Sequence, residues 1–344
     1  MGINLGDLVK GEEFELESLQ GKIVGIDSFN VLYQFLSSII GYDGSPLRDS
    51  SGRITSHLSG LLYRTTNLIE AGIKPAFIFD GKAHKLKQKT QQERRLIREE
   101  AEEKMLQAKK EGKMDEAKKY AQRAVRLTSE MIDESKKLVE LMGLPVVQAP
   151  SEGEAQLAKM CSEGKIYATL SQDYDALLFG SPILLKNVTI SGKRKLPGRD
   201  VYYEIKPTMI KLENVMKELQ IDRKKLIWLG ILLGTDFSEK FPNIGPKKAI
   251  KLVHGNNSFE DIIKETKFEP EFDYKEIEEI FMNPMYTEDY NLEFKEPDEN
   301  GIMQFLCKER AFSEERVKKV IEKISEKAKE RGKQASISSW FGKG

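Results

Sequence analysis

The sequence contains few of the residues that form disulfides or zinc sites. Among its 344 residues there are two cysteines, Cys161 and Cys307, and three histidines. No CxxC pair occurs, and His57, His84 and His254 do not have the spacing of metal ligands. A disulfide framework and a thiolate zinc site are therefore not expected. This composition favours an intracellular location, in the cytoplasm or nucleoid, or in the nucleus if the source is eukaryotic.

The chain also lacks a long hydrophobic run and a net charge. Its longest apolar run, LIWLGILLG from Leu226, is about half as long as the ~20 residues that a membrane span requires. The N-terminal MGINLGDL has no signal-peptide pattern, so we expect a soluble protein with no membrane partner. The 55 basic and 55 acidic residues cancel, which excludes a uniformly basic nucleic-acid coat but not local segregation of charge.

Three short apolar runs each end in an aspartate: KIVGID at Asp27, PAFIFD at Asp80 and KIYATLSQD at Asp173. Such runs, without alternation, are typical of strands buried on both faces. Helical patterns such as SFNVLYQFLSSI separate them, GLPVVQA predicts a further strand, and NVTISGKRKLPGRDVYYEI predicts a hairpin. The order predicts an α/β fold with a mostly parallel central sheet flanked by helices. The aspartates would lie at the carboxyl ends of the strands, where such folds bind their ligands.

Residues 82–142 differ in composition, because they are rich in Lys, Glu, Ala, Arg and Gln and predict two solvated helices broken near EGK. Residues 82–98 contain seven basic residues and one acid. Lys87, Arg94 and Arg98 follow helical spacing, so one helical face presents all three. A surface hairpin held by ion pairs is the structural alternative, but a block of one sign close after Asp80 favours an element that handles phosphates.

Seven acidic residues lie after predicted strands or helices or in the first turn of a predicted helix. They are Asp27, Asp80, Glu152, Glu154, Asp173, Asp175 and Asp236. Local roles are the alternative: Asp27 as a helix N-cap, Asp80 before a turn glycine, and Ser151 with Glu154 as a capping box. If the sheet brings these residues together, however, their repulsion destabilises the fold unless divalent cations bind.

Oxygen ligands without histidine or cysteine favour Mg²⁺ or Mn²⁺ over zinc. Seven carboxylates are too many for one Mg²⁺, and they suit two ions about 4 Å apart, an arrangement that hydrolyses phosphodiesters. We therefore expect metal-dependent hydrolysis of a nucleic-acid backbone. Lys87 and Arg94 are assigned to the scissile phosphate, because cations must guide a phosphate into an acidic crevice.

With these residues assembled, the chain resembles the flap endonucleases, the structure-specific nucleases of replication and repair, in their archaeal form. The motifs IDSFNVLYQFL, FIFDGK, QAPSEGEAQ, SQDYDALLFG and LLGTDF carry the resemblance, which covers essentially the whole chain. It implies that the seven acids hold two Mg²⁺ ions, which Mn²⁺ can replace. It also implies that Lys87, Arg94, Glu154 and Asp173 are catalytic, and that residues 82–142 form a helical arch for a 5′ flap.

The resemblance extends to DNA binding. TDFSEKFPNIGPKKAIKL is similar to the helix-hairpin-helix of the family, which contacts the downstream duplex and binds K⁺, and a helix N-terminus with adjacent lysines suits a phosphate. The pattern departs at Asn243, where glycine is usual, and at Ala83-His84, where two prolines are common. Tyr33 resembles the position that stacks on a base; a buried aromatic is its structural alternative. The expected DNA-binding residues are Tyr33, Lys87, Arg94, Arg98, Gly245, Lys247 and Lys248.

The C-terminal stretch KAKERGKQASISSWFGKG is polar and rich in small residues, so we expect a disordered tail. Its QASISSWF resembles a sliding-clamp-binding peptide, with two exposed aromatics that have no folding rationale. Such a peptide would insert its aromatics in a pocket on the clamp. The clamp-binding residues are Gln334, Ile337, Trp340 and Phe341.

The expected division of the chain follows from these motifs. Residues 1–98 and 116–260 form the nuclease regions, 82–142 the arch, about 226–255 the helix-hairpin-helix, 261–328 a C-terminal helical part of the core, and 329–344 the tail.

The expected function is that of a monomeric, Mg²⁺-dependent 5′ flap endonuclease with 5′–3′ exonuclease activity. It would act in Okazaki-fragment maturation and repair after recruitment by a sliding clamp. The alternatives are a related 5′ exonuclease or bubble-cutting repair nuclease, and a non-catalytic adaptor that binds junctions and the clamp. An aspartyl phosphatase is disfavoured, because Asp27-Ser28-Phe29 lacks a second aspartate.

Overall fold

The protein is described here by a computed structural model. Its described residues are 5–42, 44–189, 193–195 and 202–341, with side chains described for all of these except 193–195, 202–204 and 333–341.

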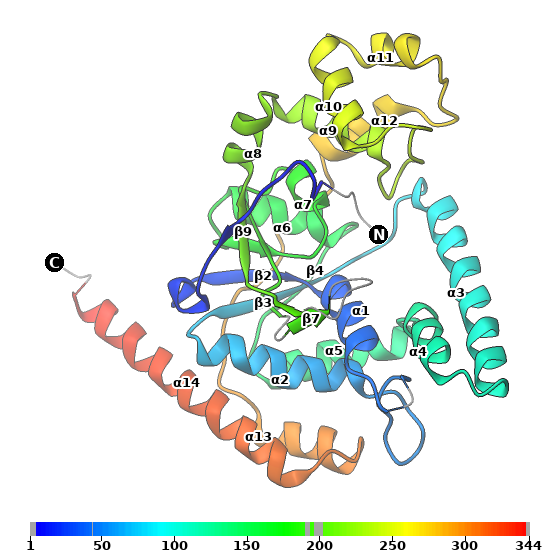
Figure 1. The fold of residues 1–344 in the computed structure, drawn as a ribbon. Coiled ribbons are helices and arrows are strands. Elements are labelled where there is room, and N and C mark those ends of the chain that lie inside the picture. The colour runs from blue at the N-terminus through cyan, green and yellow to red at the C-terminus, as the bar shows by residue number, and fades with distance from the viewer. Residues whose placement is uncertain (1–4, 43, 190–192, 196–201, 342–344) are drawn as a thin grey trace.

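A seven-stranded sheet forms the centre of the molecule (Figure 1), in the order β1-β9-β6-β5-β2-β3-β4. The five strands from β6 to β4 are parallel, whereas β9 and β1 extend the sheet antiparallel at one edge. The bounds are β1 Glu12–Glu13, β2 Ile23–Asp27, β3 Lys74–Phe79, β4 Val146–Gln148, β5 Ala168–Leu170, β6 Ile183–Lys186 and β9 Thr208–Lys211. The mostly parallel sheet expected from the apolar runs is confirmed, and the expected hairpin is present as β7 (Lys193–Lys195) paired with β8 (Tyr202–Glu204).

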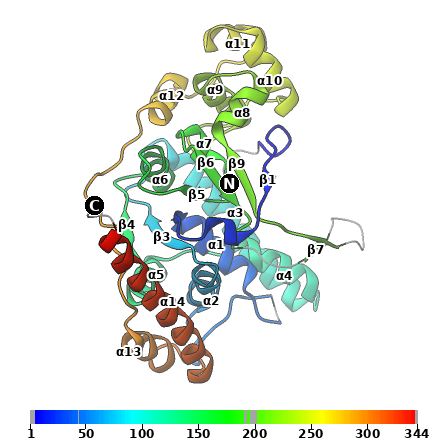
Figure 2. The ribbon, with the colours of Figure 1, turned by 90° about the vertical axis from the view of Figure 1, so that its left-hand side faces the viewer.

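Helices cover both faces of this sheet (Figures 1 and 2). In β3, Phe77 and Phe79 pack with α1, α2, α5 and α14, whereas Ala76 and Ile78 pack with α6 on the opposite face. These buried apolar contacts on both faces explain why the strands read as unbroken hydrophobic runs. The bounds are α1 Ser28–Ser38, α2 Ser56–Glu70, α5 Ser129–Leu141, α6 Gly153–Ser162 and α14 Glu314–Phe341.

A group of shorter helices lies beyond the β9 side of the sheet, at the top of Figure 1. Residues 226–232 of α9 are buried and pack among these helices, so LIWLGILLG is a core helix, as expected. No helix in the described ranges is long and apolar enough to cross a membrane. The bounds are α7 Asp175–Leu178, α8 Leu212–Leu219, α9 Arg223–Leu233, α10 Pro246–Gly255, α11 Phe259–Thr266 and α12 Tyr274–Met282. Three further short helical segments are η1 Leu16–Leu19, α13 Glu299–Ile302 and η2 Met303–Lys308.

The charged segment after β3 forms two helices that stand beside the core, α3 (Lys87–Lys110) and α4 (Met114–Arg123), as Figure 1 shows. The chain reverses at Gly112, whose φ of 73° favours glycine. Only alanines are buried in either helix, because the two helices pack mainly on each other and leave most of their remaining surface to solvent. The expected break near EGK is confirmed.

The C-terminal segment differs from the expected disordered tail. Helix α14 begins at Glu314 and continues to Phe341, so the backbone of residues 329–341 is helical. Lys, Ala, Glu, Arg and Gln dominate KAKERGKQA, and these residues have high helix propensity. The side chains expected to bind a clamp, those of Gln334, Ile337, Trp340 and Phe341, lie outside the described part.

Candidate active site

Acidic side chains meet at the carboxyl ends of β5, β2 and β3, which are adjacent in the sheet. Asp27 is the last residue of β2 and caps α1, with Oδ1 accepting the Asn30 N–H at 3.1 Å. Asp80 follows β3, and its Oδ1 accepts the Gly153 N–H at the start of α6 at 2.8 Å. The N-cap role weighed for Asp27 is thus compatible with a shared site, whereas Asp80 bonds across to α6 and is not followed by the simple turn weighed for it.

The hydroxyl of Ser171 connects three of the acids. Its Oγ lies 3.1 Å from Asp27 Oδ2 and 3.2 Å from Glu154 Oε1. The same oxygen accepts the Asp173 N–H at 3.2 Å. The capping box of Ser151 and Glu154, weighed as the local alternative, is absent, because α6 begins at Gly153 with Glu152 at the N-cap and without a side-chain cap. The Glu154 side chain is therefore available to the crevice.

The pKa values show that the acids act on one another. Burial, and then the charge of Asp80, raises the pKa of Asp27 to about 8. Burial and the charge of Glu152 raise the pKa of Asp80 to about 6. Burial, followed by the charges of Asp175, Asp27 and Asp173, raises the pKa of Glu154 well above its usual value. The crevice is therefore short of positive charge.

Two cations from α3 reach into this crevice. Lys87 Nζ pairs with Glu152 and lies 3.3 Å from Asp236 Oδ2. Arg94 pairs with Asp236 through its guanidinium. Although burial opposes the change, Lys87 and then Arg94 lower the pKa of Asp236. Lys87 and Arg94 therefore lie among the acidic residues.

All seven acids belong to this network of contacts and charges. Within the described residues, no three Asp, Glu, His or Cys side chains are arranged as a ready metal site. Glu152 and Asp236 pair with Lys87 and Arg94 instead.

Arg98, the third cation of the predicted face, lies against the ring of Tyr33. Its guanidinium carbon lies 5.4 Å from the centroid of the Tyr33 ring, a cation–π distance. Tyr33 is partly exposed, so the alternative of a fully buried core aromatic is not what the structure shows. The ring and the guanidinium link α1 to α3 beside the crevice.

Three polar residues at the site were not anticipated from the sequence: Asn30, Ser171 and Lys186. The Lys186 Nζ, at the end of β6, lies 3.3 Å from the centroid of the Tyr174 ring. Burial lowers the pKa of Lys186 to about 8, although Asp173 opposes this shift. A lysine that ends the apolar run ILLK is a signal of the same kind as the aspartates that end the other strands.

The proposed helix-hairpin-helix lies at α10. Gly245 is the N-cap, with Pro246 as the first helical residue, and Lys247 and Lys248 are exposed in the first turn. Asn243 has φ 57°, so the asparagine that departs from the family pattern accommodates the left-handed turn conformation. The geometry delivers a helix N-terminus and two ammonium groups to one surface.

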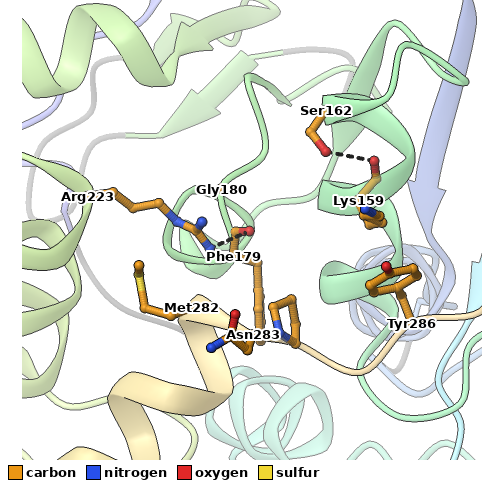
Figure 3. A pocket seen from close by; sticks show the side chains of 9 residues that line it. Lys159, Ser162, Phe179, Gly180, Arg223, Met282, Asn283 and Tyr286 are labelled. Carbon is orange, nitrogen blue, oxygen red and sulfur yellow. Dashed lines mark hydrogen bonds between the residues drawn. The ribbon is translucent and has the colours of Figure 1, made fainter.

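A pocket of about 360 Å³ lies elsewhere, between α6, α9 and α12 (Figure 3). Its Arg223 donates to three carbonyl oxygens, those of Leu178, Phe179 and Phe281, at 3.2, 2.9 and 2.6 Å. Its Lys159 pairs with Glu163 at 2.8 Å. Both cations therefore serve the fold, and none of the seven acids lines this pocket.

Comparison with known proteins shows the family to which this chain is related. Residues 1–101 match the family model of the XPG N-terminal domain, and residues 143–236 match that of the XPG I-region. The chain is 55% identical over 344 residues to flap endonuclease 1 of Thermococcus onnurineus, with 100% of both chains covered. It is 54% identical over 342 residues to flap endonuclease 1 of Pyrococcus horikoshii, covering 99% of this chain and 98% of that one.

A solved structure agrees with these relatives. Flap endonuclease-1 from Methanococcus jannaschii superposes with a TM-score of 0.76 at 40% identity, covering 96% of this chain and 100% of that chain. The chain therefore belongs to the flap endonuclease 1 family of XPG-type nucleases. Its activity is that of a structure-specific 5′ flap endonuclease, a hydrolase that acts on DNA, and the expected α/β fold is confirmed.

Proposed function

We propose that the acids at the ends of β2, β3 and β5, with those of α6, α7 and Asp236, hold two divalent ions. The observation that carries this proposal is the Ser171 cluster, in which Asp27 and Glu154 lie within 3.2 Å of one hydroxyl. Burial and mutual repulsion raise the pKa values of these acids, and a bound cation removes both penalties. The donors are carboxylate oxygens, which fit Mg²⁺, with Mn²⁺ as a substitute.

Bound ions of this kind generate hydroxide from water and stabilise the departing oxygen of a phosphodiester. The ligands would be Asp27, Asp80, Glu152, Glu154, Asp173, Asp175 and Asp236. Among them, we assign Glu154 and Asp173 to the reacting centre. The Glu154 carboxylate and the Asp173 N–H each lie 3.2 Å from the Ser171 hydroxyl.

Lys87 and Arg94 would bind the scissile phosphate. Both cations pair with Glu152 or Asp236 in this structure, and both come from α3, the helix that borders the crevice. A phosphate that enters an acidic crevice is repelled unless cations accompany it. Ions bound by the acids would release Lys87 and Arg94, which could then pair with the phosphate.

The remaining DNA contacts are proposed from position and charge. Residues 82–142 would form an arch for the 5′ flap, with Arg98 along its inner helix and Tyr33 stacked on a base near the cut. Gly245, Lys247 and Lys248 would contact phosphates of the downstream duplex, with K⁺ at the same hairpin. Backbone N–H groups at a helix N-terminus and lysine side chains both suit phosphate oxygens.

We further propose that the protein is a monomer recruited by a sliding clamp in Okazaki-fragment maturation and repair, with 5′–3′ exonuclease activity as well. The spacing of Gln334, Ile337, Trp340 and Phe341 supports the clamp interaction. Aromatic side chains that fill a pocket on a partner are typical anchors of such interfaces.

The test uses a labelled 5′-flap substrate with Mg²⁺ and then with Ca²⁺. We expect cleavage with Mg²⁺, and binding with little turnover with Ca²⁺. Asp173→Ala should abolish cleavage with at most a modest loss of junction affinity. If the wild type is inactive with both ions, the chain is a binding adaptor, and normal cleavage by Asp173→Ala would refute the metal site.

A further inference from the structure

Asn30 uses both ends of its side chain at the active site. Its Nδ2 donates to Asp173 Oδ2 at 3.1 Å, and its Oδ1 accepts the Gln172 N–H at 3.0 Å. Its backbone N–H also donates to Asp27 Oδ1 at 3.1 Å. One residue in the first turn of α1 thus fixes the acid that ends β2 and the acid that follows β5.

Ser171 makes a complementary set of contacts from the end of β5. The residue is fully buried, and its Oγ lies within hydrogen-bond distance of Asp27 Oδ2, Glu154 Oε1 and the Asp173 N–H. A serine hydroxyl has one hydrogen and two lone pairs. It therefore donates to one carboxylate at a time and accepts from the backbone, which ties three acids from three elements to one atom.

Within the part of the chain that the structure describes, the side-chain hydrogen bonds of Asn30 and Ser171 go to proposed metal ligands or to the backbone of residues 172–173. Carboxylates that repel one another turn away from a common centre unless donors hold them. Loss of a partner that orients a metal ligand typically lowers metal affinity or activity by about 10- to 100-fold. Neither residue can itself supply a charge to the reaction.

We propose that Asn30 and Ser171 are positioning residues that hold three carboxylates in the relative places required to bind divalent ions. The inference rests on the metal site proposed above. It goes beyond that site by assigning its preorganisation to an amide and a hydroxyl that are not themselves proposed ligands. Asn30 sets the direction of Asp173, whereas Ser171 sets the spacing between Asp27 and Glu154.

The test measures metal binding as well as cleavage in Ser171→Ala and Asn30→Leu. Mn²⁺ is titrated calorimetrically into the DNA-free protein, and single-turnover cleavage is measured across Mg²⁺ concentrations. We expect each substitution to weaken Mn²⁺ affinity by about 10- to 100-fold and to raise the Mg²⁺ midpoint by a similar factor. Junction affinity in EDTA should be unchanged. Ser171→Thr, which restores the hydroxyl, should recover most of the loss.

Two matched controls separate positioning from general stability. Ser181 is also fully buried, and it bonds to Thr169 Oγ1 at 2.9 Å and the Ile183 carbonyl at 3.2 Å, outside the acidic cluster. Asn291 repeats the pattern of Asn30 at an exposed place, with Nδ2 at 3.4 Å from Glu293 Oε2 and Oδ1 accepting the Glu293 N–H at 2.8 Å. Ser181→Ala and Asn291→Leu should leave Mn²⁺ affinity unchanged.

Asp173→Ala is measured alongside to separate two kinds of failure. If Asp173→Ala loses Mn²⁺ affinity while Ser171→Ala and Asn30→Leu bind as the wild type does, the positioning inference is overturned and the metal site stands. If Asp173→Ala also binds Mn²⁺ normally, the metal site itself is wrong. Should Asn30→Leu not fold, Asn30→Ser, whose side chain is too short to reach Asp173, gives the same measurement.

Discussion

Replacing Lys87 by methionine tests how the acidic crevice is neutralised. Lys87 Nζ pairs with Glu152, lies 3.3 Å from Asp236 Oδ2, and sits 5.1 Å from the centroid of the Phe237 ring. Its side chain is 15% exposed, so the pairs are largely shielded from water. Methionine has a similar length and keeps an apolar contact with Phe237, so Lys87→Met removes chiefly the charge.

The expected magnitude depends on whether divalent ions are present. Removing one partner of a buried ion pair costs about 3–5 kcal/mol, because the remaining charges are left uncompensated. Burial and the charge of Glu152 raise the pKa of Asp80 to about 6, although Lys87 opposes this rise. Loss of Lys87 should therefore raise the pKa of Asp80 further. Bound Mg²⁺ supplies the missing charge, and the cost in stability should therefore become smaller with Mg²⁺ than with EDTA.

In Lys87→Met, the cleavage rate should fall although Mg²⁺ binding is not weakened. Without Lys87 to compete for Glu152 and Asp236, Mg²⁺ should bind at least as tightly as in the wild type. The single-turnover rate should nevertheless fall by a factor on the order of 10²–10³, the usual effect of losing one preorganised donor to a transition-state oxygen.

Urea unfolding in EDTA and in saturating Mg²⁺, together with single-turnover cleavage, provides the assay. Lys89→Met is the matched control, because Lys89 lies on the same helix and its Nζ pairs with Glu239 at the surface with 61% of the side chain exposed. That control should cost less than about 1 kcal/mol. An equal loss of stability for Lys87→Met with and without Mg²⁺, or a normal cleavage rate, would refute the reasoning.

Three further predictions concern pH, the fold and the tail. Asp27 and Asp80 have raised pKa values of about 8 and about 6 in the folded protein, so the free energy of unfolding in EDTA should fall as pH rises from about 4 to about 8; urea titrations that show the reverse slope would contradict this. Arg223→Met should destabilise the fold by about 2 kcal/mol in thermal unfolding, because the guanidinium donates to three carbonyls, yet leave the rate per folded molecule unchanged; a slower rate would connect the pocket to catalysis. Deletion of residues 334–344 should weaken stimulation by the clamp and spare basal cleavage. Full stimulation of the shortened chain would refute the assignment of a clamp-binding peptide to these residues.

The convergence of the acids could be predicted because it depends on a general property of parallel sheets. Asp27 and Asp80 end or follow strands that prove to be neighbours, and Asp173 follows the strand on the other side of β2. Carboxyl ends of neighbouring parallel strands meet at one edge, so the acids need no further signal. The helical spacing of Lys87 and Arg94 was sufficient for the same reason, since one face of α3 borders that edge.

The residues that hold the acids in place could not be found in this way. Ser171 and Asn30 are 141 positions apart in the sequence, and a serine or an asparagine at the end of a strand or in a first helical turn is ordinarily explained by local capping. The same local rule gave the wrong cap for α6, because Ser151 and Glu154 fit a capping box in sequence. In three dimensions Glu154 is instead within reach of Ser171.

The ion pairs of Lys87 and Arg94 with the acids, and their proposed contacts with the scissile phosphate, together determine the order in which metal ions and DNA should engage the site. The charges of Lys87 and Arg94 cannot fully neutralise both the acids Glu152 and Asp236 and a phosphate, and a cation that leaves an acid exposes a buried negative charge. Transfer of these cations to DNA therefore requires that other positive charge already occupies the acids. On the proposed metal site, the acids would hold divalent ions before Lys87 and Arg94 engage the scissile phosphate, so preincubation with Mg²⁺ should remove any lag that appears when Mg²⁺ is added last to a preformed protein–DNA complex. A lag of equal length in both orders would show that the ion pairs of α3 do not control entry of the phosphate.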